Sequence, residues 1–186
     1  MNLITIIKCN QGWISSLKKL DDGRLAAADE YSNLIIYNKQ TFNPDIIIEN
    51  KLAGFEDFIQ LKNKNIACSF YSNKTIKIIK IKNNNYEDIQ MIKNAHNRNI
   101  TKLIELKNEN LITFSSDGSF KIWKINRSFK IWKSNNNYKY EKIFEVKETN
   151  RLSDGLEIKD NEIILYTIYP QSLVFYDLNL KKKLKL

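Results

Sequence analysis

The sequence predicts an all-β protein built from four copies of one four-stranded unit, and two observations support this prediction. A polar turn of four residues, set between two aliphatic residues, recurs four times along the 186-residue chain. The apolar runs after each turn are rich in β-branched and aromatic residues and often alternate with polar ones, which is typical of strands. A chain of this length buries enough surface for one core, so we expect residues 1–186 to form a single domain.

The repeated turn keeps a constant register. It spans residues 20–25, 61–66, 106–111 and 158–163, with starts separated by 41, 45 and 52 residues. From the second aliphatic residue to the end of the next apolar run, the spacing is 12 or 13 residues in every copy. A period of about 40–45 residues with four strands is typical of a β-propeller blade. We expect blades at approximately 13–51, 54–94, 96–147 and 151–186.

The third repeat is longer than the others because it contains a tandem duplication. Its predicted strands are approximately 100–106, 111–115, 119–125 and 140–146. The segment Ser119–Lys124, of sequence SFKIWK, recurs nine residues later as Ser128–Lys133. Both copies are equally good strand sequences, so the sequence leaves open which copy occupies the third strand.

The third repeat also resembles a WD40 repeat. Ala95-His96 stands where that family has Gly-His, and Trp123-Lys124 stands where it has Trp-Asp. The resemblance implies a hydrogen-bonded structural tetrad that ties the outer strand to the inner hairpin and fixes strand register. The residues at the tetrad positions are His96, Thr113, Asp117 and Trp123.

The other three repeats depart from this motif and contain no histidine. The position of Thr113 is taken by Ala27, Cys68 and Leu165, and that of Trp123 by Tyr37, Ile79 and Tyr176. We therefore expect these blades to depend on apolar packing. Cys68 is expected to be a small core residue and not a reactive thiol.

The sequence offers little support for catalysis. A catalytic interpretation would join His96 and Asp117 with Ser115 or Ser116, but no oxyanion-hole motif or glycine elbow accompanies them. The chain has one histidine and no Gly-rich phosphate loop, metal-ligand cluster, HExxH or GxSxG motif. We predict a protein that is not an enzyme and that has no cofactor or metal.

Charge and cysteine content bear on partners and location. The 30 basic and 21 acidic residues give a net charge of +9, which favours acidic partners and makes nucleic-acid binding the alternative function. Cys9 and Cys68 form no C-x-x-C pair, and the N-terminus lacks a signal-peptide pattern. We expect a cytoplasmic or nuclear protein that is not membrane-bound.

Four WD40-like blades would form an open arc or partial propeller with apolar faces at both ends. Residues 3–8 resemble the leading strand that closes propellers of that family, and the lysines at 181–183 are read as a solvated or edge-protecting segment. Three explanations remain open: a fragment of a longer propeller, which we favour, a ring of eight blades made by two copies, and four blades that stand alone.

The resemblance implies a scaffold that binds other proteins, holding their peptide segments on the propeller face. This expectation rests on fold analogy, since fold alone does not determine function. Aromatic residues often anchor interfaces, so the candidate binding residues are those near the turns between second and third strands. They are Tyr31, Tyr71 and Tyr169.

Overall fold

The computed structural model describes residues 6–7, 12–50, 53–126, 139–147, 151–168, 171–179 and 182–184. These residues form sixteen β-strands and no helix. The strands make four antiparallel sheets of four strands each, in a propeller-like arrangement. The predicted all-β class and β-propeller architecture are therefore confirmed.

Each sheet is one contiguous segment of the chain and forms one blade, with its strands in sequence order. The first blade contains β1 (Ile14–Lys19), β2 (Leu25–Asp29), β3 (Asn33–Tyr37) and β4 (Pro44–Glu49). The second contains β5 (Phe55–Gln60), β6 (Ile66–Phe70), β7 (Ile76–Lys82) and β8 (Asn85–Ile92). The third contains β9 (Ile100–Glu105), β10 (Leu111–Ser115), β11 (Ser119–Asn126) and β12 (Lys139–Lys147). The fourth contains β13 (Leu152–Lys159), β14 (Glu162–Thr167), β15 (Ser172–Asp177) and β16 (Lys182–Leu184).

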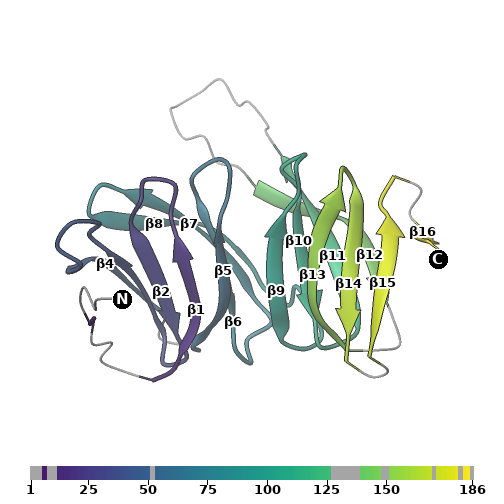
Figure 1. Cartoon of the computed structure of the whole chain (residues 1–186), viewed down its shortest axis with the longest axis horizontal. Helices are drawn as coiled ribbons and strands as arrows, with labels where there is room; N and C mark the ends of the chain where they lie inside the picture. The colour runs from purple at the N-terminus through teal and green to yellow at the C-terminus, as the bar shows by residue number, and fades with distance from the viewer. Residues whose placement is uncertain are drawn as a thin grey trace, which may run out of the picture.

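The blades follow one another in space as they do in the sequence. Their first strands pack side by side in the order β1, β5, β9 and β13. Figure 1 shows the first blade at one end of the long axis and the fourth blade at the other. Among the described residues, each inner blade therefore has a neighbour on both faces, whereas the first and fourth blades have one neighbouring blade each.

The repeated polar turn has the same backbone conformation in all four blades. Its third residue adopts a positive φ of 88° at Gly23, 67° at Lys64, 67° at Glu109 and 62° at Asn161. In the first three blades the N–H of this residue donates to the carbonyl of the preceding aliphatic residue, at 2.8–2.9 Å. A left-handed residue is therefore required at this position, although only the first blade supplies glycine.

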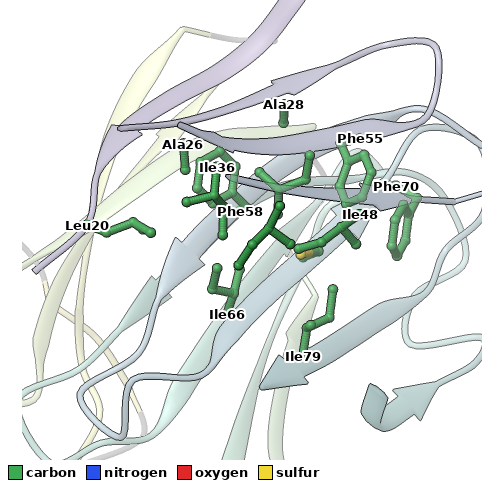
Figure 2. Close-up of a cluster of buried hydrophobic side chains, with 13 residues drawn as sticks. Leu20, Ala26, Ala28, Ile36, Ile48, Phe55, Phe58, Ile66, Phe70 and Ile79 are labelled. Atoms are coloured by element: carbon green, nitrogen blue, oxygen red, sulfur yellow. The ribbon is translucent and has the colours of Figure 1, made fainter. Parts of the chain in front are cut away.

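A hydrophobic core lies between each pair of neighbouring blades. Between the first and second blades, buried side chains of both sheets form one cluster, which Figure 2 shows in close-up. The rings of Phe55 and Phe70 lie 4.8 Å apart in this cluster. Separate clusters join the second blade to the third and the third to the fourth.

Polar contacts also recur between blades. The first polar residue of the turn donates its backbone N–H to a side chain of the next blade. This side chain lies near the end of that blade's first strand. These bonds are Asp21 N to Gln60 Oε1 at 2.7 Å, Lys62 N to Glu105 Oε2 at 2.8 Å and Lys107 N to Glu157 Oε2 at 2.8 Å.

The buried carboxylate of Asp57 on β5 links three blades. Its Oδ1 accepts a hydrogen bond from the hydroxyl of Ser16 on β1 at 3.1 Å, and its Oδ2 accepts one from the backbone N–H of Leu103 on β9 at 3.1 Å. Lys18 lies 3.4 Å from Oδ1 and supplies a compensating charge. Since a buried carboxylate needs such partners, Asp57 fixes the relative placement of the first three blades.

The first copy of the duplicated segment occupies the third strand of the third blade. Ser119–Lys124 lies within β11, which pairs with β10 through the contact of Phe114 with Phe120. The tight turn at Asp117 and Gly118, where Gly118 has φ 81°, places this copy directly opposite β10. The second copy, at 128–133, lies outside the described residues, as does most of the expected leading strand at 3–8.

Candidate functional site

A chain of buried hydrogen bonds runs through the third blade. His96, in the loop before β9, has Nε2 at 2.7 Å from Thr113 Oγ1 on β10 and Nδ1 at 2.9 Å from Ser119 Oγ on β11. The indole Nε1 of Trp123 donates to Thr113 Oγ1 at 3.0 Å. The Ser119 hydroxyl donates to Asp117 Oδ1 at 2.6 Å. The structure thus brings His96, Thr113, Asp117 and Trp123 into one network, with Ser119 as a fifth member.

The direction of these hydrogen bonds follows from which atoms carry a proton. Because the Ser119 hydroxyl donates to Asp117, its oxygen must accept from Nδ1–H of His96. A neutral imidazole with a proton on Nδ1 has an acceptor at Nε2, so the Thr113 hydroxyl donates to that atom. Each side-chain donor in the chain then has an acceptor, from the indole of Trp123 to the carboxylate of Asp117.

The link from His96 to Asp117 is indirect. Nδ1 of His96 lies 3.6 Å from Oδ2 of Asp117, which is too long for a hydrogen bond. That oxygen instead accepts the backbone N–H of Asn97 at 2.7 Å, while Oδ1 also accepts the backbone N–H of Ser119 at 2.8 Å. Asp117 therefore holds both the histidine loop and the start of β11.

Burial governs the protonation of the histidine. Desolvation lowers the pKa of His96 below its ordinary value, although the neighbouring Asp117 acts in the opposite direction. Burial alone would raise the pKa of Asp117, but the neighbouring His96 and the hydrogen bonds from Ser119 and Asn97 hold it far below its usual range. At neutral pH the site therefore contains a neutral imidazole and an ionised carboxylate.

A second contact fixes the histidine loop to β11. The ammonium group of Lys121 donates to the carbonyl oxygen of Ala95 at 2.6 Å and lies 3.5 Å from Glu145 on β12. Lys77, at the corresponding position of the second blade, lies 2.8 Å from Asp88 on β8. These lysines keep their charges paired where the outer strand covers them.

The serines considered as nucleophiles have other partners. The hydroxyl of Ser115 donates to the carbonyl of Arg98 at 3.3 Å, and that of Ser116 donates to the carbonyl of Asn99 at 3.4 Å. The serine that does meet His96 is Ser119, which is fully buried and gives its proton to Asp117. This geometry fixes a loop and a strand, and it differs from that of a serine activated by a histidine base.

Ser119 was not predicted from the sequence, because it is not one of the four tetrad positions that the resemblance implies. A signal was present, since the first residue after the turn between second and third strands is polar in every blade: Asn33, Thr75, Ser119 and Ser172. In the first blade the Asn33 amide donates to Asp29 at 3.0 Å, and in the fourth the hydroxyls of Ser172 and Thr167 lie 2.7 Å apart. A polar contact across this turn is thus common to several blades.

Two of the three candidate binding tyrosines are exposed at the same end of neighbouring blades. Tyr31 lies between β2 and β3 and is 60% exposed, and Tyr71 lies between β6 and β7 and is 58% exposed. The Asp29 carboxylate accepts the backbone N–H of Tyr31 at 3.0 Å, and the Tyr71 N–H donates to the carbonyl of Gly54 at 2.8 Å. Tyr169 lies outside the described residues.

The described residues contain no group of three or more histidine, cysteine, aspartate or glutamate side chains placed to hold a metal ion. The same part of the chain has no helix with the length and apolar character required to cross a membrane.

The sequence was also compared with known proteins. No family model matches the chain, and no curated protein is similar to it in sequence.

Proposed function

We propose that this protein is a non-enzymatic interaction scaffold of the WD40 type, which holds peptide segments of other proteins at the end of the blades that carries Tyr31 and Tyr71. The WD40 assignment is supported by the third blade, where His96, Thr113, Asp117 and Trp123 lie in one hydrogen-bonded network. That network stabilises the blade and leaves its surface loops available for recognition.

The observation that carries the proposal is the pair of exposed tyrosines. Because Tyr31 and Tyr71 lie in corresponding turns of adjacent blades, both rings are presented at one end of the molecule. Tyrosine combines a large apolar ring with a hydroxyl group and loses little side-chain entropy on binding, so it is frequent at interface hot spots.

The turns beneath these rings are already ordered. Asp29 accepts the N–H groups of Tyr31 and Asn33, and Gly12 lies against the Tyr31 ring, since a Cβ there would come within 2.0 Å of Cδ2. Gly54 receives the Tyr71 N–H and leaves no room for a Cβ, which would lie 1.7 Å from the carbonyl oxygen of Glu30. An ordered surface of this kind reduces the entropic cost of binding a flexible peptide.

Part of the basic charge is paired with carboxylates at the surface. Several lysines that contribute to the net charge of +9 lie within salt-bridge distance of carboxylates. Lys64 lies 2.5 Å from Asp21, Lys107 lies 2.6 Å from Asp160, and Lys159 lies 3.2 Å from Glu162. Paired lysines release few counterions on contact with a phosphate backbone, but nine basic residues remain in excess over the acidic ones, so nucleic acid stays the alternative partner.

The proposal can be tested with peptides selected from a random library on the immobilised 186-residue chain. Affinities of synthetic copies are then measured by fluorescence polarisation for the wild type, for the double variant Tyr31→Ser/Tyr71→Ser, and for Phe42→Ser. Phe42 is an exposed aromatic residue in the turn between β3 and β4, at the opposite end of the first blade from Tyr31, and serves as the control. We expect the double variant to bind at least about tenfold more weakly, and the control variant to match the wild type.

Two results would contradict the proposal. One is peptide binding that the double variant leaves unchanged. The other is binding of single- or double-stranded nucleic acid, in the absence of peptide binding, with an affinity that falls steeply between about 50 and about 300 mM salt. The second result would establish the nucleic-acid alternative.

A further inference from the structure

Each core between blades is formed by two different faces. We call the face that a blade turns toward the next blade its trailing face, and the opposite one its leading face. In the last core, the trailing face of the third blade contributes Leu106, Ile112, Phe114, Phe120 and Ile122. The leading face of the fourth blade contributes Leu152, Ile163, Leu165, Val174 and Tyr176. All ten side chains are buried.

The trailing face of the fourth blade has the same apolar character, but none of the described sheets packs beside it. Strand register identifies its residues, because the pairs Ile112–Ile122 and Phe114–Phe120 correspond to Ile164–Phe175 and Tyr166–Leu173. Ile158 takes the position of Leu106. Leu173 is 61% exposed, whereas Phe120 at the same position of the third blade is fully buried.

The leading face of the first blade corresponds to the leading face of the fourth blade, which forms the other half of the last core. Its residues at the positions of Leu152, Ile163, Leu165, Val174 and Tyr176 are Ile14, Leu25, Ala27, Ile35 and Tyr37. Leu17, which corresponds to Gly155, is 61% exposed. Ile14, and Ile47 on the neighbouring strand β4, are also exposed. The two ends of the molecule thus carry the two halves of a contact that the chain already makes three times.

A charged pair at the turns follows the same correspondence. Between the third and fourth blades, Lys107 Nζ lies 2.6 Å from Asp160 Oδ1. The residues at these positions on the two end faces are Lys159 in the fourth blade and Asp22 in the first. Opposite charges would therefore meet if a fourth blade packed against a first blade in the same way.

From this correspondence we propose that the partner of the end faces is a second copy of this chain. The trailing face of each copy packs on the leading face of the other, and two copies close a ring of eight blades. Because the same contact is made twice, both pairs of apolar faces are covered and no end is left to extend the assembly. This arrangement continues the established core between blades and needs no new type of contact.

Two positions in the contact between copies differ from the contact between the third and fourth blades. Leu17 stands where Gly155 lies against Phe114, so it has to be accommodated beside Tyr166. The other position is unfavourable through its charge and provides a sharp test. Gln60, Glu105 and Glu157 accept a backbone N–H from the preceding blade, but Lys19 occupies that position in the first blade. In the ring, Lys19 would face the N–H of Lys159 without offering an acceptor. Lys19→Glu would supply the acceptor and remove a repulsive pair of charges.

The first experiment measures the mass of the 186-residue chain by light scattering and sedimentation over a concentration series. We expect a limiting species at twice the chain mass of 21.9 kDa. A monomer at all concentrations up to about 100 µM would overturn the proposal, since even weak specific contacts are occupied there. Masses that keep rising with concentration would exclude a closed ring.

The second experiment asks whether unlike faces meet. Leu17→Glu alters only the leading face and Leu173→Glu only the trailing face, and each places a charge in the proposed contact. Each variant alone is expected to dissociate at least about tenfold more readily, with circular dichroism confirming that it is folded. Mixed together, they retain one intact contact, so native mass spectrometry should detect a dimer with one copy of each. Failure to form mixed dimers would contradict the pairing of unlike faces.

The third experiment looks for a gain of affinity, which misfolding cannot mimic. Lys19→Glu should lower the dimer dissociation constant about threefold to tenfold. Lys93→Glu makes the same charge change at an exposed site between the second and third blades, and it should leave the constant unchanged. Equal effects of the two variants, or no effect of Lys19→Glu, would contradict the proposed contact.

Discussion

The imidazole Nε2 of His96 and the hydroxyl of Thr113 lie 2.7 Å apart in the buried interior of the third blade. The same hydroxyl oxygen accepts the indole N–H of Trp123. One threonine therefore joins a loop, an inner strand and the next strand of the sheet.

Removal of this hydroxyl should destabilise the protein. Thr113→Val keeps the shape of the side chain but removes the partner of His96 Nε2 and of Trp123 Nε1, so we expect a loss of about 1–3 kcal/mol in the free energy of unfolding. Urea denaturation followed by tryptophan fluorescence measures this loss. Thr113→Ser, which keeps the hydroxyl, should lose clearly less, and equal losses for both variants would argue against the hydrogen-bonded chain.

Stability should fall as the pH is lowered from about 7.5 to about 5.5. The pKa of His96 is lowered by burial, so in this range the unfolded chain takes up a proton that the folded protein excludes. The pKa of Asp117 is lowered too far to contribute there, and Glu56 and Glu105, whose pKa values burial raises, act in the opposite direction.

This pH effect can be assigned to one residue. In His96→Gln the free energy of unfolding should be lower at pH 7.5 but should depend less on pH than in the wild type. Chemical denaturation at several pH values gives both quantities. A variant with an unchanged pH dependence would show that groups other than His96 are responsible.

At the third position of the repeated turn, glycine should be more stable than alanine. Lys64 has a φ of 67°, which glycine adopts without the steric cost that a Cβ brings. Lys64→Gly should therefore be about 0.5–1 kcal/mol more stable than Lys64→Ala, since both variants lose the contact with Asp21 and differ only at the backbone. Thermal unfolding of the two variants compares them. Gly23→Ala should be less stable than the wild type, because Gly23 has a φ of 88° at the same turn position.

Close packing between the third and fourth blades limits which residues can replace Gly155. A Cβ at Gly155 would lie 2.6 Å from Cζ of Phe114 and 3.1 Å from the carbonyl oxygen of Ile164. Gly155→Ala should therefore cost about 1–3 kcal/mol through overpacking. Combining it with Phe114→Leu, which vacates part of the space, should cost less than the sum of the two single changes. Additive losses in a double-mutant cycle would show that the ring and the glycine do not compete for space.

Cys68 should be unreactive in the folded protein. Its side chain is fully buried, and burial raises the pKa of the Cys68 thiol far above its ordinary value, so the nucleophilic thiolate is not formed. In Cys9→Ser, where Cys68 is the remaining cysteine, a chromogenic disulfide reagent should react only after urea is added. Fast reaction without denaturant would show that the core between the first two blades opens readily.

The sequence by itself determined the strands and their grouping. The aliphatic pair five residues apart, the polar turn between them and the β-branched runs that follow are local features, and each acts through the backbone of its own hairpin. For this reason the second and third strands of the third blade, at 111–115 and from 119 onward, could be placed from sequence. The positions of His96, Thr113 and Trp123 could be named as well, because the resemblance rested on their spacing.

Only the tertiary structure decided which copies of a repeated position are buried and which polar groups meet. Phe120 and Leu173 occupy the same position in consecutive blades, and both are apolar in sequence, yet one is fully buried and the other is 61% exposed. Their burial depends on whether another blade packs against that face, which no local pattern encodes. Ser119 entered the histidine network, and Asp57 came to link three blades, for the same reason. Their partners lie up to 46 residues away in sequence, and only the packing of whole sheets brings them within hydrogen-bonding distance.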